Sequence, residues 1–200
     1  MKTLLIASAL ILSSASSFAG KAIPAGTYTV DAAHSKIGFE IPHLVISSVE
    51  GHFSKFDGSI TIEDKIEKSK ASLNIETASI NTDNKDRDDH LRSPDFFDAA
   101  KNPKITFVTK KVVGTAENLK LVGDISIKGK TKEVTLDVKY LGDVKDPWGN
   151  NKIAFTAIGK INRQDFGLTW SKVVEAGPVV GDEVTLQIKV QASKQAAKAK

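Results

Sequence analysis

The side chains best suited to catalysis or metal binding in this sequence are its four histidines. Imidazole is a common catalytic base and the commonest metal ligand in proteins. His34, His43 and His52 recur every nine positions, with no second histidine or carboxylate at helical spacing, so they form no metal-binding motif. We interpret these three as hydrogen-bonded structural residues or surface residues, and we expect neither a metal nor another cofactor.

The fourth histidine, His90, lies in the charged run Arg87-Asp88-Asp89-His90-Leu91. A carboxylate beside an imidazole could act as an acid and base pair, which leaves open an enzyme that works on a bound lipid through Asp89 and His90. The sequence supplies no nucleophile and no oxyanion site to complete such a centre. We therefore expect no catalytic residues, and we expect Arg87 to pair with a neighbouring carboxylate.

The composition excludes several other kinds of function. The chain has no cysteine, which rules out disulfides, thiolate metal sites and thiol redox chemistry. Its 28 Lys and Arg residues only slightly outnumber its 24 Asp and Glu residues, and it lacks arginine clusters with interleaved aromatic residues. We therefore expect no nucleic-acid partner. We interpret residues 193–200, which hold three lysines, as a solvated tail that could touch anionic lipid head groups.

The N-terminal residues have the layout of a secretory signal peptide. A basic start precedes an apolar run from Leu4 to Leu12, and small residues lead to Ala19. The run is too short for a membrane-spanning helix, which needs about 20 apolar residues. We predict a cleaved signal peptide over residues 1–19, a single domain over residues 20–192 and the lysine-rich tail over residues 193–200.

Beyond Gly26, apolar and polar residues alternate with a period of two, which predicts half-buried β-strands. Lys128-Gly129-Lys130 predicts a tight hairpin, and residues 146–151 predict a longer loop, so neighbouring strands should pair antiparallel. We expect eight or nine strands, which begin near Thr27, Lys36, Val49, Ala71, Ile105, Leu119, Lys132, Lys152 and Glu183.

Amphipathic strands without long covering helices must bury their apolar faces against another sheet or against themselves. A sandwich and a closed barrel both achieve this, and an outer-membrane barrel would show the same alternation. An expected long strand from Val49 to Glu63, with Gly51 and Gly58 to bend it, favours closure. An aromatic content of only 6%, without paired aromatic girdles, favours a soluble barrel over a membrane barrel.

The interior of an eight-stranded barrel is wide enough to hold one small ligand or to be filled by side chains. Small residues within the strands leave both a cavity and simple bends open as interpretations. These residues are Gly38, Gly58, Gly123, Ala157 and Gly159.

Residues 81–103 interrupt the strand pattern with a dense run of charged residues. A structureless connection of about 20 residues is uncommon in a compact domain. Ser93 followed by Pro94 is a favourable helix start, because serine caps free amides and proline fits the first helical position. We predict one or two short helices here, with Phe96 and Phe97 plugging one end of the barrel.

Short motifs in a fixed order run along nearly the whole chain. The most specific are Ser79–Thr82 (SINT), Arg87–Leu91 (RDDHL), Asp95–Asp98 (DFFD) and Asn102–Phe107 (NPKITF), with Val49–Phe53 (VEGHF) before them and Ile161–Leu168 (INRQDFGL) after them. In this order and spacing the sequence resembles the YceI-like family of periplasmic polyisoprenoid-binding proteins.

The resemblance implies an all-β, lipocalin-like, antiparallel eight-stranded β-barrel that is closed by a short helical insertion at about residues 81–103. It implies a periplasmic protein that holds a polyisoprenoid, a quinone-like molecule or another long-chain lipid in the barrel, as a carrier or store without catalysis. A stress or interaction protein with no physiological ligand stays open as an alternative. A homodimer and a transient contact with a membrane surface also stay open.

An isoprenoid presents many methyl groups and almost nothing to hydrogen-bond, so its contacts should be large apolar side chains that face inward. Each such side chain could equally be ordinary core. We predict ligand contacts from Phe39, Ile41, Phe53, Phe56, Leu91, Phe96, Phe97, Phe107, Phe155, Phe166 and Trp170. Polar residues at the barrel mouth would contact a head group, but the sequence does not identify them.

Overall fold

The computed structural model describes residues 22–174 and 177–196. The predicted signal peptide and residues 197–200 of the predicted tail lie outside the described residues. The longer strands are β1 (Gly26–Val30), β2 (Lys36–His43), β3 (Ser47–Phe53), β4 (Phe56–Ile62), β5 (Lys70–Glu76), β7 (Lys104–Thr115), β8 (Asn118–Ile127), β9 (Lys130–Lys145), β10 (Asn151–Asn162) and β13 (Glu183–Lys194). The shorter elements are β6 (Ile80–Asn81), β11 (Val173–Val174), β12 (Gly177–Pro178), the α-helix α1 (Lys85–Arg92) and the 3-10 helices η1 (Ala32–His34), η2 (Ile66–Lys68), η3 (Thr77–Ser79) and η4 (Arg163–Phe166).

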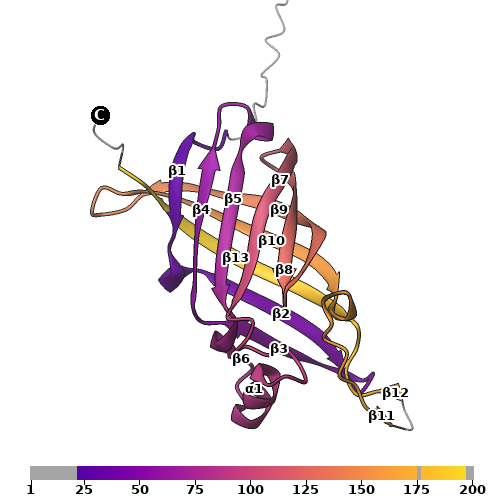
Figure 1. Cartoon of the computed structure of the whole chain (residues 1–200). Coiled ribbons are helices and arrows are strands. Elements are labelled where there is room, and N and C mark those ends of the chain that lie inside the picture. Colours follow the sequence, from indigo (N-terminus) through magenta and orange to yellow (C-terminus); the bar gives the residue numbers. More distant parts are fainter. Residues whose placement is uncertain (1–21, 175–176, 197–200) are drawn as a thin grey trace, which may run out of the picture.

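Eight antiparallel strands close into a barrel in the order β1, β4, β5, β7, β8, β9, β10 and β13, which confirms the predicted fold class (Figure 1). The last strand, β13, pairs with β10 on one side along nearly its whole length. On its other side β13 is forked, because Thr185–Lys189 pair with β2 whereas Ala192–Lys194 pair with β1. The first two residues assigned to the tail, 193 and 194, therefore belong to the barrel wall.

The fork is held by polar contacts around η1. The backbone N–H of Asp31 donates to the Gln191 carbonyl, and the Gln191 N–H donates to Ser35 Oγ. Burial favours a higher pKa for Asp31, but hydrogen bonds from His34, Lys152 and Gln191 outweigh it and lower that pKa. His34 is therefore a hydrogen-bonded structural residue, as the sequence suggested.

The predicted long strand from Val49 to Glu63 is wrong, because the segment forms two strands with different partners. β3 pairs with β2 and β6, whereas β4 pairs with β1 and β5. The chain breaks at Ser54 and Lys55, whose N–H groups donate to the carbonyl and to the hydroxyl of Ser79 respectively. This corner carries the chain from the extra β2–β3–β6 layer into the barrel.

The two predicted connections are confirmed. Lys128 and Gly129 both have positive φ, 49° and 73°, as a tight turn between β8 and β9 requires. In the loop between β9 and β10, Asp146 Oδ1 accepts the N–H groups of Trp148 and Asn150. Each connection is short, so that consecutive strands are neighbours in the barrel.

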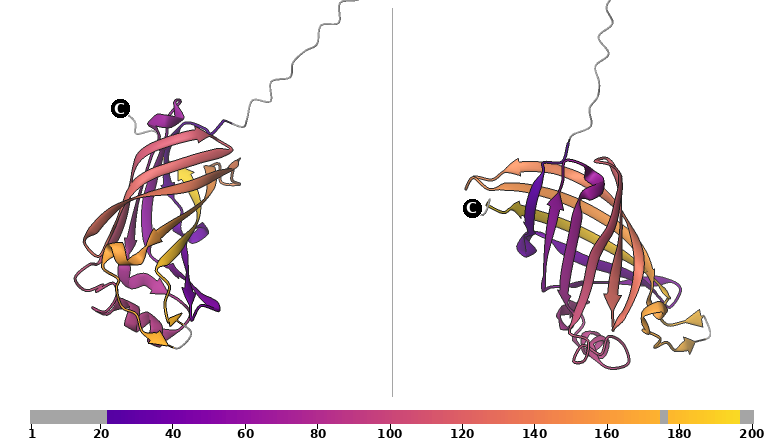
Figure 2. Two further views of the ribbon diagram at one scale, coloured as in Figure 1. Left: turned by 90° about the vertical axis from the view of Figure 1, so that its right-hand side faces the viewer. Right: turned by 45° about the horizontal axis from the view of Figure 1, so that its top comes forward.

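The insertion at residues 81–103 contains a helix, but that helix does not start at Ser93. Asn84 caps α1 by accepting the Arg87 N–H with its side chain, at 3.0 Å. Ser93 instead ends α1, because its N–H donates to the His90 carbonyl. The turns after Ser93 carry Phe96 and Phe97 against the end of the barrel, which we call the α1 end (Figure 2). No helix of the described residues is both long enough and apolar enough to span a membrane.

The end of the barrel opposite α1 is filled by packed side chains. Tyr28, Ile62, Tyr140, Ile153, Phe155 and Ala192 form a buried cluster there, and Ile66 of η2 packs against it. Two strand glycines make room for neighbouring side chains instead of widening the interior. A Cβ on Gly123 would collide with the ring of Phe107, and one on Gly159 would collide with the side chain of Leu136.

Candidate functional site

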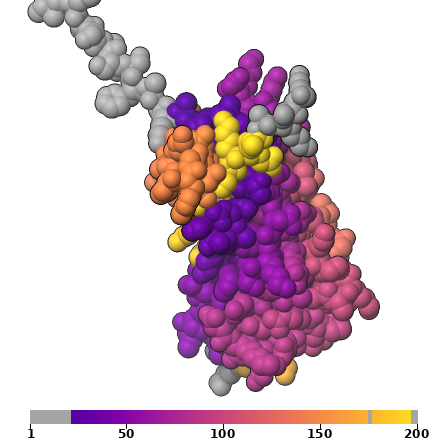
Figure 3. Space-filling model, turned by 90° about the vertical axis from the view of Figure 1, so that its left-hand side faces the viewer, coloured from indigo at the N-terminus to yellow at the C-terminus, as the bar shows by residue number. Residues whose placement is uncertain are grey.

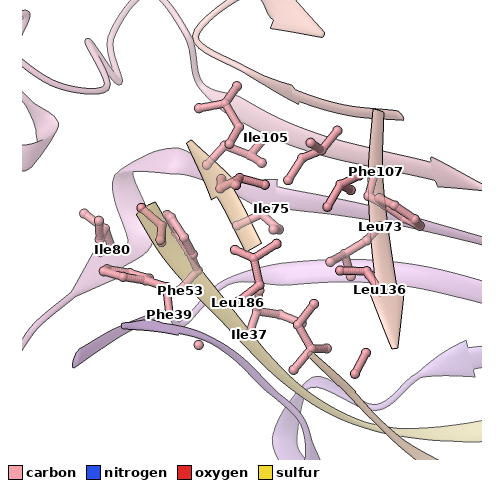
Figure 4. A pocket seen from close by; sticks show the side chains of 18 of the residues that line it. Ile37, Phe39, Phe53, Leu73, Ile75, Ile80, Ile105, Phe107, Leu136 and Leu186 are labelled. Carbon is pink, nitrogen blue, oxygen red and sulfur yellow. The ribbon is translucent and has the colours of Figure 1, made fainter. Parts of the chain in front are cut away.

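The barrel encloses a cavity of about 590 Å³. Each of the eight barrel strands contributes residues to its wall, and most of these residues are aliphatic or aromatic. Figure 4 shows side chains from several strands converging on this space, among them Ile37, Leu73 and Leu186. Such a volume lies within the range of about 300–1,000 Å³ that is usual for small-molecule sites. Exposed residues line the cavity at both ends of the barrel. Pro42 and Asp86 lie at the α1 end, which we call the mouth, and Lys70 lies beside η2 at the opposite end.

Most of the predicted ligand contacts lie on this cavity. The residues that line it are Phe39, Ile41, Phe53, Leu91, Phe96, Phe97, Phe107, Phe155 and Trp170. Two predicted contacts are elsewhere: Phe56 packs against the side of the core, and Phe166 is fully buried in η4 without reaching the cavity. Apart from Ile41 and Leu91, the predicted set omits the aliphatic residues of the wall, such as Leu121 and Ile188. The alternation of apolar and polar residues along their strands identifies these aliphatic residues as inward-facing.

Aromatic rings form a cover at the α1 end. The His90 ring meets the rings of Phe96 and Trp170 edge-on, with centroids 5.0 and 5.1 Å apart, and those two rings lie 5.2 Å from each other. Phe97 continues the cover toward the barrel through an edge contact with Phe53 at 6.1 Å. We refer to His90, Phe96, Phe97 and Trp170 as the aromatic cover. It joins the α1 segment to the loop after η4.

A polar network fixes α1 at the mouth of the cavity. The buried Asp88 carboxylate accepts the backbone N–H of Thr82 at 2.8 Å and its hydroxyl at 2.6 Å. Arg87 donates to the Thr82 hydroxyl and carbonyl, both at 2.7 Å. The expected carboxylate partner of Arg87 is therefore wrong. The hydroxyl and carbonyl oxygens of Thr82 accept from Arg87 instead. The nearby carboxylate, Asp88, accepts the N–H and O–H groups of Thr82.

This network makes Asp88 important for stability. Asp88→Ala should lower the free energy of unfolding by about 2 kcal/mol, because two buried donors on Thr82 lose their acceptor. Urea unfolding followed by circular dichroism measures the change. Asp86→Ala, on the exposed side of the same helical turn, is the matched control and should shift the unfolding midpoint little. Equal midpoints for the two variants would contradict the anchoring role of Asp88.

The structure does not join Asp89 and His90 into an acid and base pair. Asp89 is exposed and accepts from Lys85 and Arg92, and these contacts, led by the Lys85 hydrogen bond, lower its pKa. His90 Nε2 lies instead 3.0 Å from Asp95 Oδ2. No cluster of three or more potential metal ligands occurs among the described residues.

A second basic residue at the α1 end, Arg163, could not be recognised from charge and spacing in the sequence. It is 2% exposed and lines the cavity, although it lies in the Ile161–Leu168 motif that carries the family resemblance. Its guanidinium donates to the carbonyls of Leu168, Trp170 and Gly181 and to Asp182 Oδ1. Arg163 thereby anchors the loop that carries Trp170 of the aromatic cover.

Comparison with known sequences gives a consistent result. The YceI-like domain matches residues 28–192. Protein YceI from Escherichia coli O17:K52:H18 is 38% identical over 180 residues, which cover 88% of this chain and 91% of the relative. A UPF0312 protein from Serratia proteamaculans is 40% identical over 190 residues, which cover 94% of this chain and 93% of the relative.

Solved structures share the fold. Burkholderia cenocepacia BcnA has a TM-score of 0.72 at 25% identity, covering 81% of this chain and 98% of its own. The Campylobacter jejuni YceI protein has a TM-score of 0.68 at 36% identity, covering 83% and 96%. A polyisoprenoid binding domain from Saccharophagus degradans, implicated in plant cell wall breakdown, shares the fold at 17% identity with a TM-score of 0.62, covering 84% and 98%. The chain therefore belongs to the YceI-like family.

Proposed function

We propose that this protein binds a long isoprenoid or fatty chain inside the barrel and carries or stores it without catalysis. The observation that carries the proposal is the largely apolar cavity of about 590 Å³, which extends inside the barrel from the aromatic cover to the packed side chains at the opposite end. Burial of apolar ligand surface contributes about 25 cal/mol per Å². The affinity would therefore come from many aliphatic and aromatic contacts and not from a few polar ones.

The distribution of polar residues supports one orientation of the ligand. More polar residues line the cavity at the α1 end, among them Asp86, Arg87 and His90, than beside η2, where Ser69, Lys70 and Ser72 line it. A polar head group is favourable only where it keeps hydrogen-bonding partners. The hydrocarbon chain would therefore enter the barrel first, and a quinone-like or other polar head would stay beside α1.

Two further observations bear on the ligand and on the compartment. The shared fold of the Saccharophagus degradans domain supports the architecture of a polyisoprenoid-binding barrel. The signal-peptide pattern over residues 1–19 supports export, and we propose that the protein works in the periplasm.

The direct test is mass spectrometry of an organic extract of the natively purified full-length protein. We expect at least one co-purifying lipid with a long prenyl or acyl chain, in an amount approaching one molecule per protein. Extracts of a similarly purified protein without an apolar cavity provide the background. An empty extract, with no uptake when farnesol, a polyprenol and oleic acid are then offered, would favour an interaction protein whose cavity has no physiological ligand.

A further inference from the structure

We propose that the protein docks on lipid bilayers through an apolar tip beside the cavity mouth and that the lipid passes there between membrane and barrel. The inference rests on the proposed function and adds the route by which the ligand enters. The apolar tip consists of Leu44–Ile46, which connect β2 to β3, together with β11 and β12.

The tip exposes large aliphatic side chains to solvent. Ile46 is 89% exposed, Val173 81%, Val45 64% and Val174 43%. Single exposed aliphatic residues are ordinary on protein surfaces, but several gathered from separate loops mark an interaction surface. The described segments of the tip, residues 44–46, 173–174 and 177–178, contain no charged residue, although Lys172 directly precedes β11 and Glu175 lies between β11 and β12 in the sequence.

The two parts of the tip are tied together by backbone hydrogen bonds. The Leu44 N–H donates to the Val179 carbonyl at 3.0 Å, and the Gly181 N–H donates to the Pro42 carbonyl at 2.9 Å. Leu44 and Val45 have φ of 52° and 68°, a left-handed conformation that is unfavourable for a β-branched residue such as valine. Backbone strain of this kind persists only where the surrounding structure imposes it. Here the strained residues belong to a loop whose aliphatic side chains are exposed to water.

The tip continues directly from the wall of the cavity. Pro42, His43, Val179 and Val180 line the cavity, and the chain runs from them into the exposed residues of the tip. Figures 1 and 2 place the β11–β12 hairpin and the end of β2 at the same end of the barrel as α1. With the tip in the acyl region of a bilayer, an apolar chain could move from membrane to cavity without crossing bulk water.

The chemistry of the tip predicts how this docking responds to salt. Attraction between a lysine-rich segment and anionic lipids is screened at high ionic strength, whereas burial of aliphatic side chains is not. We therefore expect binding to phosphatidylcholine vesicles that persists in about 0.5 M salt. Binding that required phosphatidylglycerol and disappeared in salt would assign the contact to the basic tail and overturn the proposal.

The variant that tests the tip is Ile46→Asp combined with Val173→Asp. Vesicle co-sedimentation should fall at least about tenfold, because two charged side chains would have to enter the acyl region. Val144→Asp is the matched control, since Val144 is as exposed as Val45, at 64%, and belongs to β9. The β9–β10 hairpin projects well away from the α1 end (Figure 3). The control should bind vesicles as the unchanged protein does.

Two further measurements separate failure of the tip from failure of the proposed function. The double variant should retain co-purified lipid but transfer a fluorescent fatty acid to phosphatidylcholine vesicles at least about tenfold more slowly than the unchanged protein. Retention with unchanged transfer would reject the tip alone, whereas an empty cavity in the unchanged protein would reject the function. A dimer that the double substitution dissolves would show that a second copy covers the tip, and would overturn membrane docking.

Discussion

Ala157→Trp should abolish lipid retention and leave the barrel folded. Ala157 lies in the middle of β10, lines the cavity and pairs with Val138 and Ile188, which line it as well. An indole at this position would extend across the space that a hydrocarbon chain needs. Extra atoms in a packed core cost about 1–3 kcal/mol, but here part of the added volume enters an existing cavity. We therefore expect a moderate loss of stability with at least a tenfold loss of bound lipid.

The neighbouring residue in the same strand provides the control. Ile158 is 56% exposed and points away from the interior, so Ile158→Trp adds the same indole to the outer surface. Lipid per mole of protein, measured in organic extracts, should fall only in the Ala157 variant, while thermal unfolding verifies that both variants are folded. Undiminished lipid in a folded Ala157→Trp protein would place the binding site outside the barrel.

Arg163→Met should produce the largest loss of stability among single substitutions at the α1 end. Methionine fills similar space but leaves the carbonyls of Leu168, Trp170 and Gly181 without their shared donor. A buried polar group without a partner costs about 1–3 kcal/mol, so we expect the free energy of unfolding to fall by about 4 kcal/mol. Urea unfolding measures this change, and the loss of the Trp170 anchor should also raise indole exposure in fluorescence.

A surface ion pair of Lys160, three residues earlier in β10, provides the comparison. Lys160 Nζ lies 2.7 Å from Glu183 Oε1, and both side chains are at least 60% exposed. Lys160→Met removes a positive charge as Arg163→Met does, but exposed ion pairs contribute about 1 kcal/mol at most. If the two variants unfolded at the same urea concentration, the buried hydrogen bonds of Arg163 would not be the source of its contribution.

The barrel could be predicted from the sequence because apolar and polar residues alternate along a strand. This alternation shows which side chains face the interior. Ile125 and Leu136, for example, fall on the predicted apolar faces and are buried. The alternation does not reveal which strand pairs with which. The segment from Val49 to Glu63 forms two strands instead of the predicted one, and the barrel is nevertheless closed. Side chains on the same face of one continuous strand are an even number of positions apart. Phe53 and Phe56 both face the core but are three positions apart, and this spacing marks the corner between β3 and β4.

The cavity could be predicted in outline, but its polar mouth could not. Large aromatic residues such as Phe39 and Phe107 do line the cavity, because their strands repeat with a period of two. Phe166 follows the same apolar pattern but lies in a 3-10 helix, where that period does not apply. The partners of Arg87 depend on how residues 81–84 fold back over α1. A list of nearby carboxylates cannot supply that geometry.

The fork in β13 also determines when a cavity can exist. β13 is the last of the described strands, yet it pairs with β1 and β2, the first two of them, as well as with β10. Pairing between segments so distant in sequence forms slowly, since a long loop must close first. A chain that lacks the residues from Glu183 onward therefore has no closed wall. During synthesis the wall of the cavity therefore stays open until β13 has been made, and the barrel can enclose a ligand only after that point.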